Sequence, residues 1–305
     1  MRENINLKVN IGGLELKNPV IAASGCFGFG REYSRFFDIK RLGGIAVRGL
    51  TLQPQKGNPP PRIAETPSGI LNSVGLQNPG VHTFIEKEIP FLRKIDTTII
   101  ANVSGNTIEE YESMAEILSN ADVDAIELNL SCPNVQEGCL RFGSSAQKVE
   151  SVVSRVKNYA KKPLLVKLTP NVTDITEIAK AAEEAGADSV SLINTILGMA
   201  INAKTRRPIL GSITGGLSGP AVKPIALRMV YEVSRAVKIP VIGMGGICNA
   251  TDAIEFLLAG ASAVMIGTAG FANPMVWVET IEGIEDYMAE NSINSVTELI
   301  GGLIV

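Results

Sequence analysis

The chain has 305 residues, of which 45% are hydrophobic and 19% charged, with a formal net charge of −3 and a sequence pI near 5.5. This balance predicts one globular α/β domain over residues 1–305 and leaves no basic excess with which to bind a nucleic acid. Four cysteines are too few for a disulfide framework, and no apolar stretch approaches the roughly 18 residues of a membrane span, so we expect a cytoplasmic protein without a membrane partner.

Along the chain, a short apolar run, a few small or polar residues and a helical stretch follow one another repeatedly. The apolar runs are Val20–Ala23, Gly44–Val47, Thr98–Val103, Ala125–Leu130, Leu164–Leu168, Ser189–Asn194, Val241–Met244 and Ala263–Ile266. Because the runs do not alternate between apolar and polar residues, they predict strands that are buried on both faces of a parallel sheet. A doubly wound sheet is the competing architecture, but eight such strands favour a (β/α)8 TIM barrel.

Local signals add a hairpin and helix boundaries to this barrel. Residues Leu7–Leu16 alternate about a Gly-Gly pair, which predicts an N-terminal β-hairpin that covers the bottom of the barrel. The stretches 173–186 and 249–260 each open on residues that can cap a helix and end at a glycine, which predicts two helices of the outer ring.

Polar residues follow the end of nearly every predicted strand. The active site of such a barrel lies at the carboxyl ends of its strands, and buried amides and charges need polar partners there. These strand-end residues are Ser24-Gly25, Arg48-Gly49, Asn102, Asn129, Ser131–Asn134, Lys167, Asn194-Thr195, Gly245-Gly246 and Gly267-Thr268. A bound polar ligand with hydrogen-bonding edges would supply those partners.

Glycine-rich loops follow the seventh and eighth strands, at residues 243–247 and 267–270. This fold usually binds a phosphate at those two loops, where bare main-chain N–H groups can cradle its oxygens, although glycines also make tight turns. We interpret the two loops together as a phosphate site. The strand-end amides would suit a flat heterocycle as the rest of the ligand. Lys167 would place a cation near this ring, which would become anionic on reduction.

Cys132 is the candidate catalyst. A cysteine is more often buried and inert, but this one lies between a strand-end asparagine and a proline, inside the expected pocket. His82 is the single histidine, which we expect at the surface or at a helix cap, so we expect neither a His-based metal site nor a Ser-His-Asp triad. Cys132 and Cys139 do not have the spacing of metal ligands. A redox or proton-transfer role for Cys132 remains.

The chain resembles the class 1B dihydroorotate dehydrogenases, the NAD-linked bacterial type, over nearly its whole length. The motifs that carry the resemblance are Asn18–Tyr33, Gly57–Thr66, Leu71–Gly80, Asn129–Asn134, Val166–Asn171, Ile193–Thr195 and Thr214–Pro220. The resemblance implies FMN at the mouth of the barrel, contacted by Ser24, Arg48, Gly49, Asn102, Asn129, Lys167, Ile193, Gly219, Gly245, Gly246, Gly267 and Thr268. It implies substrate contacts from Arg48, Asn72, Ser73, Val74, Gly75, Leu76, Asn129, Asn194 and Thr195.

The resemblance also implies a reaction and a partner. Dihydroorotate is oxidised to orotate in pyrimidine (UMP) biosynthesis: Cys132 takes a proton from C5 while hydride leaves C6 for the flavin. A homodimer core within a heterotetramer is implied, in which a second subunit with FAD and a 2Fe-2S cluster passes electrons to NAD+.

The chain departs from the family pattern at three positions. Arg48 stands where the family usually has lysine, Gly138-Cys139 replaces a Gly-Gly pair, and Asn202 stands where aspartate is common. Two alternative functions are kept. One is a related flavin enzyme that acts on uracil or thymine, and the other is a flavin-binding pseudoenzyme or scaffold disabled by Arg48.

Overall fold

The computed structural model describes residues 5–131 and 142–305, and its centre is a closed barrel of eight parallel strands. The strands are β3 (Val20–Ala22), β4 (Gly44–Ala46), β7 (Ile99–Val103), β8 (Ala125–Asn129), β9 (Leu164–Lys167), β10 (Ser189–Leu192), β15 (Val241–Met244) and β16 (Ala263–Ile266). They follow one another around the barrel in chain order, and β16 pairs with β3 to close it. The predicted TIM barrel is confirmed, and all eight predicted strands are present.

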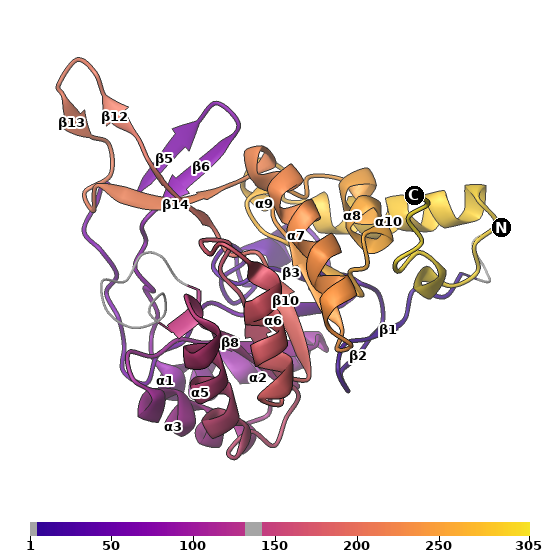
Figure 1. Cartoon of the computed structure of the whole chain (residues 1–305), viewed down its shortest axis with the longest axis horizontal. Coiled ribbons are helices and arrows are strands. Elements are labelled where there is room, and N and C mark those ends of the chain that lie inside the picture. Colours follow the sequence, from indigo (N-terminus) through magenta and orange to yellow (C-terminus); the bar gives the residue numbers. More distant parts are fainter. Residues whose placement is uncertain (1–4, 132–141) are drawn as a thin grey trace.

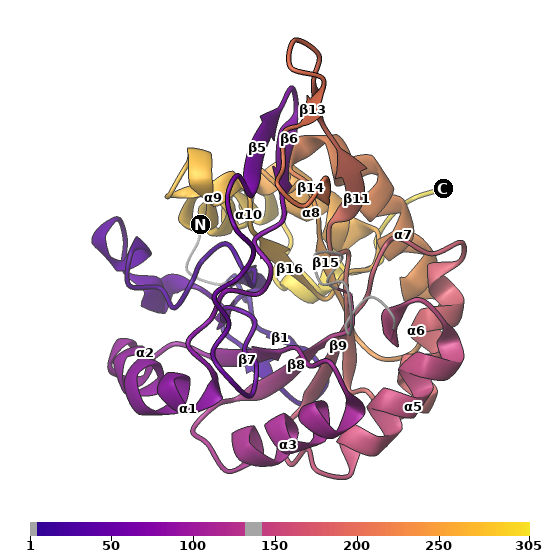
Figure 2. The same ribbon diagram turned by 90° about the vertical axis from the view of Figure 1, so that its left-hand side faces the viewer.

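Helices surround the barrel, as Figure 2 shows. They are α1 (Val81–Thr83), α2 (Ile89–Ile95), α3 (Ile108–Ser119), α5 (Ala146–Lys157), α6 (Ile175–Glu184), α7 (Lys223–Ala236), α8 (Ala250–Leu258), α9 (Ala269–Ala272) and α10 (Val276–Glu290). Both predicted helices are confirmed with their caps, because Asp174 accepts from Thr176 N at 2.8 Å and Asn249 accepts from Asp252 N at 2.9 Å. His82 is exposed on α1, as predicted for a surface residue.

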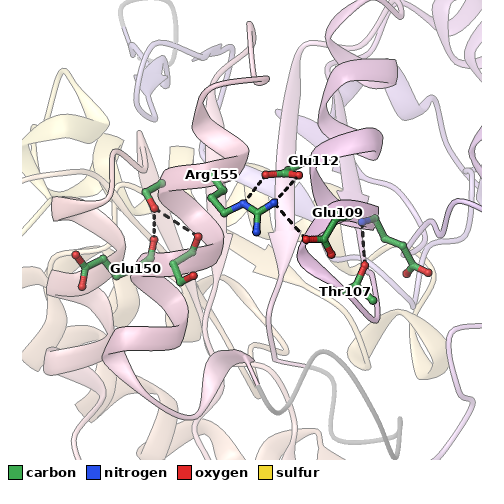
Figure 3. Close-up of polar contacts among 8 residues, drawn as sticks. Thr107, Glu109, Glu112, Glu150 and Arg155 are labelled. Atoms are coloured by element: carbon green, nitrogen blue, oxygen red, sulfur yellow. Dashed lines mark hydrogen bonds and ion pairs between the residues drawn. The ribbon is translucent and has the colours of Figure 1, made fainter.

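Neighbouring helices of the ring also make polar contacts on their outer side. Arg155 of α5 donates to Glu112 of α3 at 2.7 and 3.0 Å and to Glu109 at 3.2 Å (Figure 3). Thr107 caps the start of α3 by accepting from Glu110 N at 3.2 Å. Since Arg155 is 45% exposed, each ion pair contributes only about 0.2–1 kcal/mol, and apolar packing on the barrel holds the helices in place.

The N-terminal hairpin of β1 (Val9–Asn10) and β2 (Glu15–Leu16) is antiparallel, as predicted. Ile11, at its turn, is fully buried. The next residue, Gly12, has a φ of +72°, and a Cβ built on it would lie 2.1 Å from the carbonyl oxygen of Asp188. Asp188 directly precedes β10, so the hairpin covers the amino ends of the strands, which form the bottom of the barrel.

A second sheet lies over the opposite end and was not predicted from the sequence. It has four antiparallel strands in the order β11 (Ile196–Met199), β14 (Thr214–Ser218), β6 (Gly69–Asn72) and β5 (Ile63–Thr66). A small hairpin of β12 (Ile201–Asn202) and β13 (Arg207–Pro208) extends it into a projecting arm (Figures 1 and 2). We refer to these six strands as the roof.

Five single turns complete the described elements: η1 (Tyr33–Arg35), η2 (Ile39–Arg41), η3 (Phe84–Glu88), η4 (Pro220–Val222) and η5 (Val296–Glu298). Among the helices of residues 5–131 and 142–305, none has both the length and the apolar character needed to cross a membrane.

Two glycines in the same backbone conformation test the role of the hairpin. Gly12→Ala should lower the free energy of unfolding by about 1–2 kcal/mol for its positive φ and by about 1–3 kcal/mol more for the clash with Asp188. Gly301 also has a φ of +72° but no atom within 4 Å of a built Cβ, so Gly301→Ala should lose only the first part. Urea unfolding measures the loss in the free energy of unfolding for each variant. Equal losses would mean that Gly12 is not in close contact with Asp188.

Candidate functional site

A cavity of about 920 Å³ opens at the carboxyl ends of the barrel strands, beneath the roof. Each of the eight strands places a lining residue at its carboxyl end or within two residues after it. These residues are Ser24, Arg48, Asn102, Asn129, Lys167, Ile193, Gly245 and Gly267. The roof adds Asn72 from β6 and Ser218 from β14, so residues more than 200 positions apart in the chain share one cavity.

The cavity brings nearly all of the predicted site residues together. The predicted flavin contacts that line it are Ser24, Arg48, Gly49, Asn102, Asn129, Lys167, Ile193, Gly219, Gly245, Gly246, Gly267 and Thr268. The predicted substrate contacts that line it are Arg48, Asn72, Val74, Gly75, Leu76, Asn129, Asn194 and Thr195. Ser73 does not line it: this residue is 1% exposed and its backbone bonds to Arg62 and Asn58. Cys132 lies outside the described residues, as do Gly138 and Cys139.

Three polar side chains form a connected network on one wall. Asn194 Nδ2 donates to Ser131 Oγ at 2.7 Å, and Ser131 Oγ donates to Asn129 Oδ1 at 2.9 Å. Tyr111, buried under the same wall, donates its hydroxyl to the carbonyl of Asn129 at 2.9 Å. The network fixes the rotamers of the two asparagines before any ligand binds.

A buried carboxylate that the sequence analysis missed fixes a third asparagine. Glu127 is fully buried, and it accepts from Asn102 Nδ2 and from Ser191 Oγ, each at 2.6 Å. The amide nitrogen of Asn102 is the donor of this bond and therefore faces Glu127. Asn102 Oδ1 is buried and has no hydrogen-bond partner among the residues that the structure describes. The only signal in the sequence was an acidic residue within an apolar strand.

Lys167 provides a cation within the cavity. It is 5% exposed, and its Nζ donates to Ser24 Oγ at 3.1 Å. In the part of the chain that the structure describes, it forms no salt bridge with a carboxylate. A buried ammonium group of this kind favours an anionic ligand.

The two glycine-rich loops both contact the end of β14, one at Gly219 and the other at Ser218. Gly219, Gly245 and Gly246 have φ values of +102°, +129° and +75°, and a Cβ on Gly246 would lie 2.9 Å from the carbonyl oxygen of Gly219. Thr268 Oγ1 donates to Ser218 Oγ at 2.8 Å, which joins the loop after β16 to the roof. The glycines are therefore required by the backbone, as in tight turns, and they also leave main-chain groups uncovered, as in a phosphate cradle.

Aromatic packing holds the loop after β3 in place. The rings of Phe27 and Tyr33 stack with centroids 4.5 Å apart, and both meet the edge of Trp277 at 4.9 Å. This loop carries Cys26 into the cavity, where burial raises the pKa of its thiol to about 11 against the opposing charge of Lys167. Cys26 is therefore a neutral thiol near pH 7, unlike a catalytic thiolate.

Arg48 lines the cavity from the loop after β4, next to two residues that the sequence analysis did not assign, Gln77 and Arg62. Its Nε donates to the carbonyl of Gln77, while burial and, to a smaller extent, the charge of Arg62 lower its pKa. With Lys167, the lining holds three cations against the single carboxylate of Glu32 among the described residues. In a chain of net charge −3, this local excess of positive charge selects for anions.

A (β/α)8 barrel with amides, a buried lysine and glycine-rich loops around a cavity at its carboxyl rim has the architecture of a barrel enzyme with its site at that rim. A sequence model described as dihydroorotate dehydrogenase matches residues 6–288, and the chain belongs to this family.

Curated relatives match over almost their full length. The protein of Thermoanaerobacter pseudethanolicus named dihydroorotate dehydrogenase B (NAD(+)), catalytic subunit, is 58% identical over 98% of this chain and 99% of its own length. The proteins of the same name from Alkaliphilus metalliredigens and Bacteroides thetaiotaomicron are 58% and 59% identical, again over 98% of this chain and 99% of theirs.

Removal of the buried carboxylate tests the polar network. Glu127→Ala deprives Asn102 and Ser191 of their acceptor, and we expect a loss of about 2–4 kcal/mol in the free energy of unfolding. Glu127→Gln keeps an acceptor of the same shape and should lose less than half as much. Denaturant unfolding of both variants measures this, and identical stabilities for the two would contradict the assigned role of the carboxylate.

Proposed function

We propose that this chain is the catalytic subunit of an NAD-linked dihydroorotate dehydrogenase, which binds FMN and oxidises dihydroorotate to orotate in pyrimidine biosynthesis. The observation that carries the proposal is one cavity that gathers a cation, an amide network and a glycine cradle, in a chain nearly 60% identical to relatives of that name.

The chemistry of the cavity fits FMN. The uncovered backbone of Gly219, Gly245 and Gly246 suits a phosphate, and the unpartnered Oδ1 of Asn102 suits an N–H on a ring edge. Lys167 would stabilise negative charge on a reduced ring. When bound, FMN supplies the acceptor for the hydride that leaves C6 of the substrate.

The substrate side of the cavity would orient a pyrimidine ring. Asn129 and Asn194 belong to the fixed network and can each donate and accept, as the amide groups of such a ring require. Asn72 and Thr195 line the same cavity beneath the roof. A Cβ on Gly216 would lie 2.0 Å from Thr195 Oγ1, so the bare glycine of β14 is what lets Thr195 occupy its position.

The proposed base is Cys132, which accepts the proton from C5. It follows Ser131, which is fully buried and is hydrogen-bonded to Asn129 and Asn194. The residue that directly precedes the proposed base is therefore held in place. A thiol ionises near pH 8.5, far more readily than a hydroxyl, and it leaves no permanent charge beside an anionic substrate.

A partner completes the proposal. The relatives are named catalytic subunits, which supports a second subunit for this chain as well. We assign FAD, a 2Fe-2S cluster and the transfer of electrons to NAD+ to that subunit, and two copies of this chain to the core of a heterotetramer. The sparse cysteines support a place in the cytoplasm.

The decisive measurement is anaerobic. The purified protein should carry a yellow flavin that dihydroorotate bleaches within the mixing time, because hydride transfer reduces it. Dihydrouracil, which lacks the carboxylate, serves as the control and should leave the colour unchanged. Bleaching by dihydrouracil alone would favour the dihydropyrimidine alternative. A flavin that neither compound bleaches would favour the scaffold, and Arg48→Lys would then show whether the arginine is responsible.

The proposed base has its own test. Cys132→Ser should retain the flavin but lose at least about 100-fold in turnover near pH 7, because a serine hydroxyl is a poor base there. Cys139→Ser, in the same segment, should keep normal turnover. Steady-state rates with an artificial electron acceptor measure both variants. Normal turnover in Cys132→Ser would remove this residue from the mechanism.

A further inference from the structure

Two guanidinium groups meet at one residue of the cavity wall, Gln77. Arg48 donates its Nε to the main-chain carbonyl of Gln77, and Arg62 donates its Nη2 to the side-chain Oε1 at 2.5 Å. Both arginines line the cavity, although Arg48 comes from the loop after β4 and Arg62 directly precedes β5 of the roof. One glutamine therefore fixes two cations from different layers of the molecule.

Neither arginine is neutralised by the residues around it. The other bond of Arg62 goes to the carbonyl of Asn58 at 3.1 Å, which is a neutral acceptor. Across residues 5–131 and 142–305, neither Arg48 nor Arg62 forms a salt bridge. Glu32 lines the same cavity and favours the charged form of Arg48 through space, but it is not bonded to it. Like charges held together in a partly buried wall repel, and an anion between them relieves that repulsion.

The position of the pair indicates which anion it binds. In the proposed function, the glycine cradle at Gly245 and Gly246 takes the phosphate of FMN, and Lys167 lies at the end of β9. The arginines instead adjoin the segment of residues 74–77, since a Cβ on Gly57 would lie 2.4 Å from Val74 O and 3.0 Å from Arg62 Nη1. A planar guanidinium matches a planar carboxylate with two parallel hydrogen bonds.

We propose that Arg62 acts with Arg48 to bind the carboxylate of the substrate, and that Gln77 sets the spacing of the two guanidinium groups. This rests on the proposed function, in which the substrate is a pyrimidine ring that carries one carboxylate. Arg62 lies outside the residues that the family resemblance assigns to either ligand. It makes the site selective for the ring acid over its neutral esters.

A purely structural role for Arg62 would be to link Asn58 and Gln77 through its two hydrogen bonds. The two roles differ in one measurable respect. Loss of a structural link would lower the affinity for every ligand of the cavity alike, whereas loss of a carboxylate contact would lower it only for ligands that carry the negative charge.

The test uses the flavin-loaded protein in its oxidised form, titrated with orotate and with methyl orotate while the visible spectrum is followed. Arg62→Gln should weaken orotate binding about tenfold and change the affinity for the methyl ester less than twofold. Arg62→Lys, which keeps the charge without the fork, should recover part of the loss. Arg207→Gln, on the exposed arm, is the matched control and should bind both ligands normally.

In steady-state assays, the same loss in Arg62→Gln should appear in KM for dihydroorotate, with kcat within about twofold of the wild type. An equal loss for orotate and its ester, or no loss for either, would overturn the proposal. If Arg62→Gln fails to retain flavin, the comparison of Arg62→Lys with the wild type decides by the same criterion. Orotate binding needs no turnover, so a wild-type flavin that dihydroorotate does not bleach would count against the proposed function alone.

Discussion

Closure of the parallel barrel is the constraint on which the rest of the structure depends. Eight strands that all run the same way, each hydrogen-bonded to two neighbours, must bring all of their carboxyl ends to one rim. Residues as far apart as Ser24 and Gly267 thereby line one cavity. The strands bury both faces, so the polar groups at their ends lie where water is scarce and must find partners in the protein or in a ligand.

Some of these buried polar groups have a partner within the protein, and others do not. Glu127 satisfies the amide nitrogen of Asn102 and the hydroxyl of Ser191, but it leaves Asn102 Oδ1 open. Lys167 is bonded to a neutral serine. The protein thus satisfies some of these groups internally and holds an acceptor and a cation in fixed positions on the cavity wall.

The roof lies over the carboxyl rim of the barrel and contributes to the wall of the cavity. It adds Asn72 from β6 and, through the bare backbone of Gly216 in β14, leaves room for Thr195. It also brings Arg62 to the cavity wall that carries Arg48, with Gln77 between them. A barrel of this kind hosts many functions, and the residues that the roof adds distinguish this cavity from a bare barrel rim.

The sequence by itself determined the barrel and most of its rim. Short apolar runs separated by helical stretches are typical of strands buried on both faces, so their number and order predicted the topology. Strand-end residues such as Asn129 and Lys167 were predicted with them. The hairpin and the caps at Asp174 and Asn249 were equally local signals.

Only the tertiary structure decided the contacts between distant segments. The antiparallel roof joins residues 63–72 with residues 196–218, and pairing over such separations leaves no periodic signal in either segment. The same reason hid the pairing of Glu127 with Asn102 and the meeting of Arg62 with Arg48. Ser73 lies inside a matching motif but does not line the cavity. Adjacent residues of an extended chain point to opposite sides, and only the structure shows which side faces the cavity. Residue type and spacing follow from the chain, but which charges remain without a partner depends on every segment that folds against them.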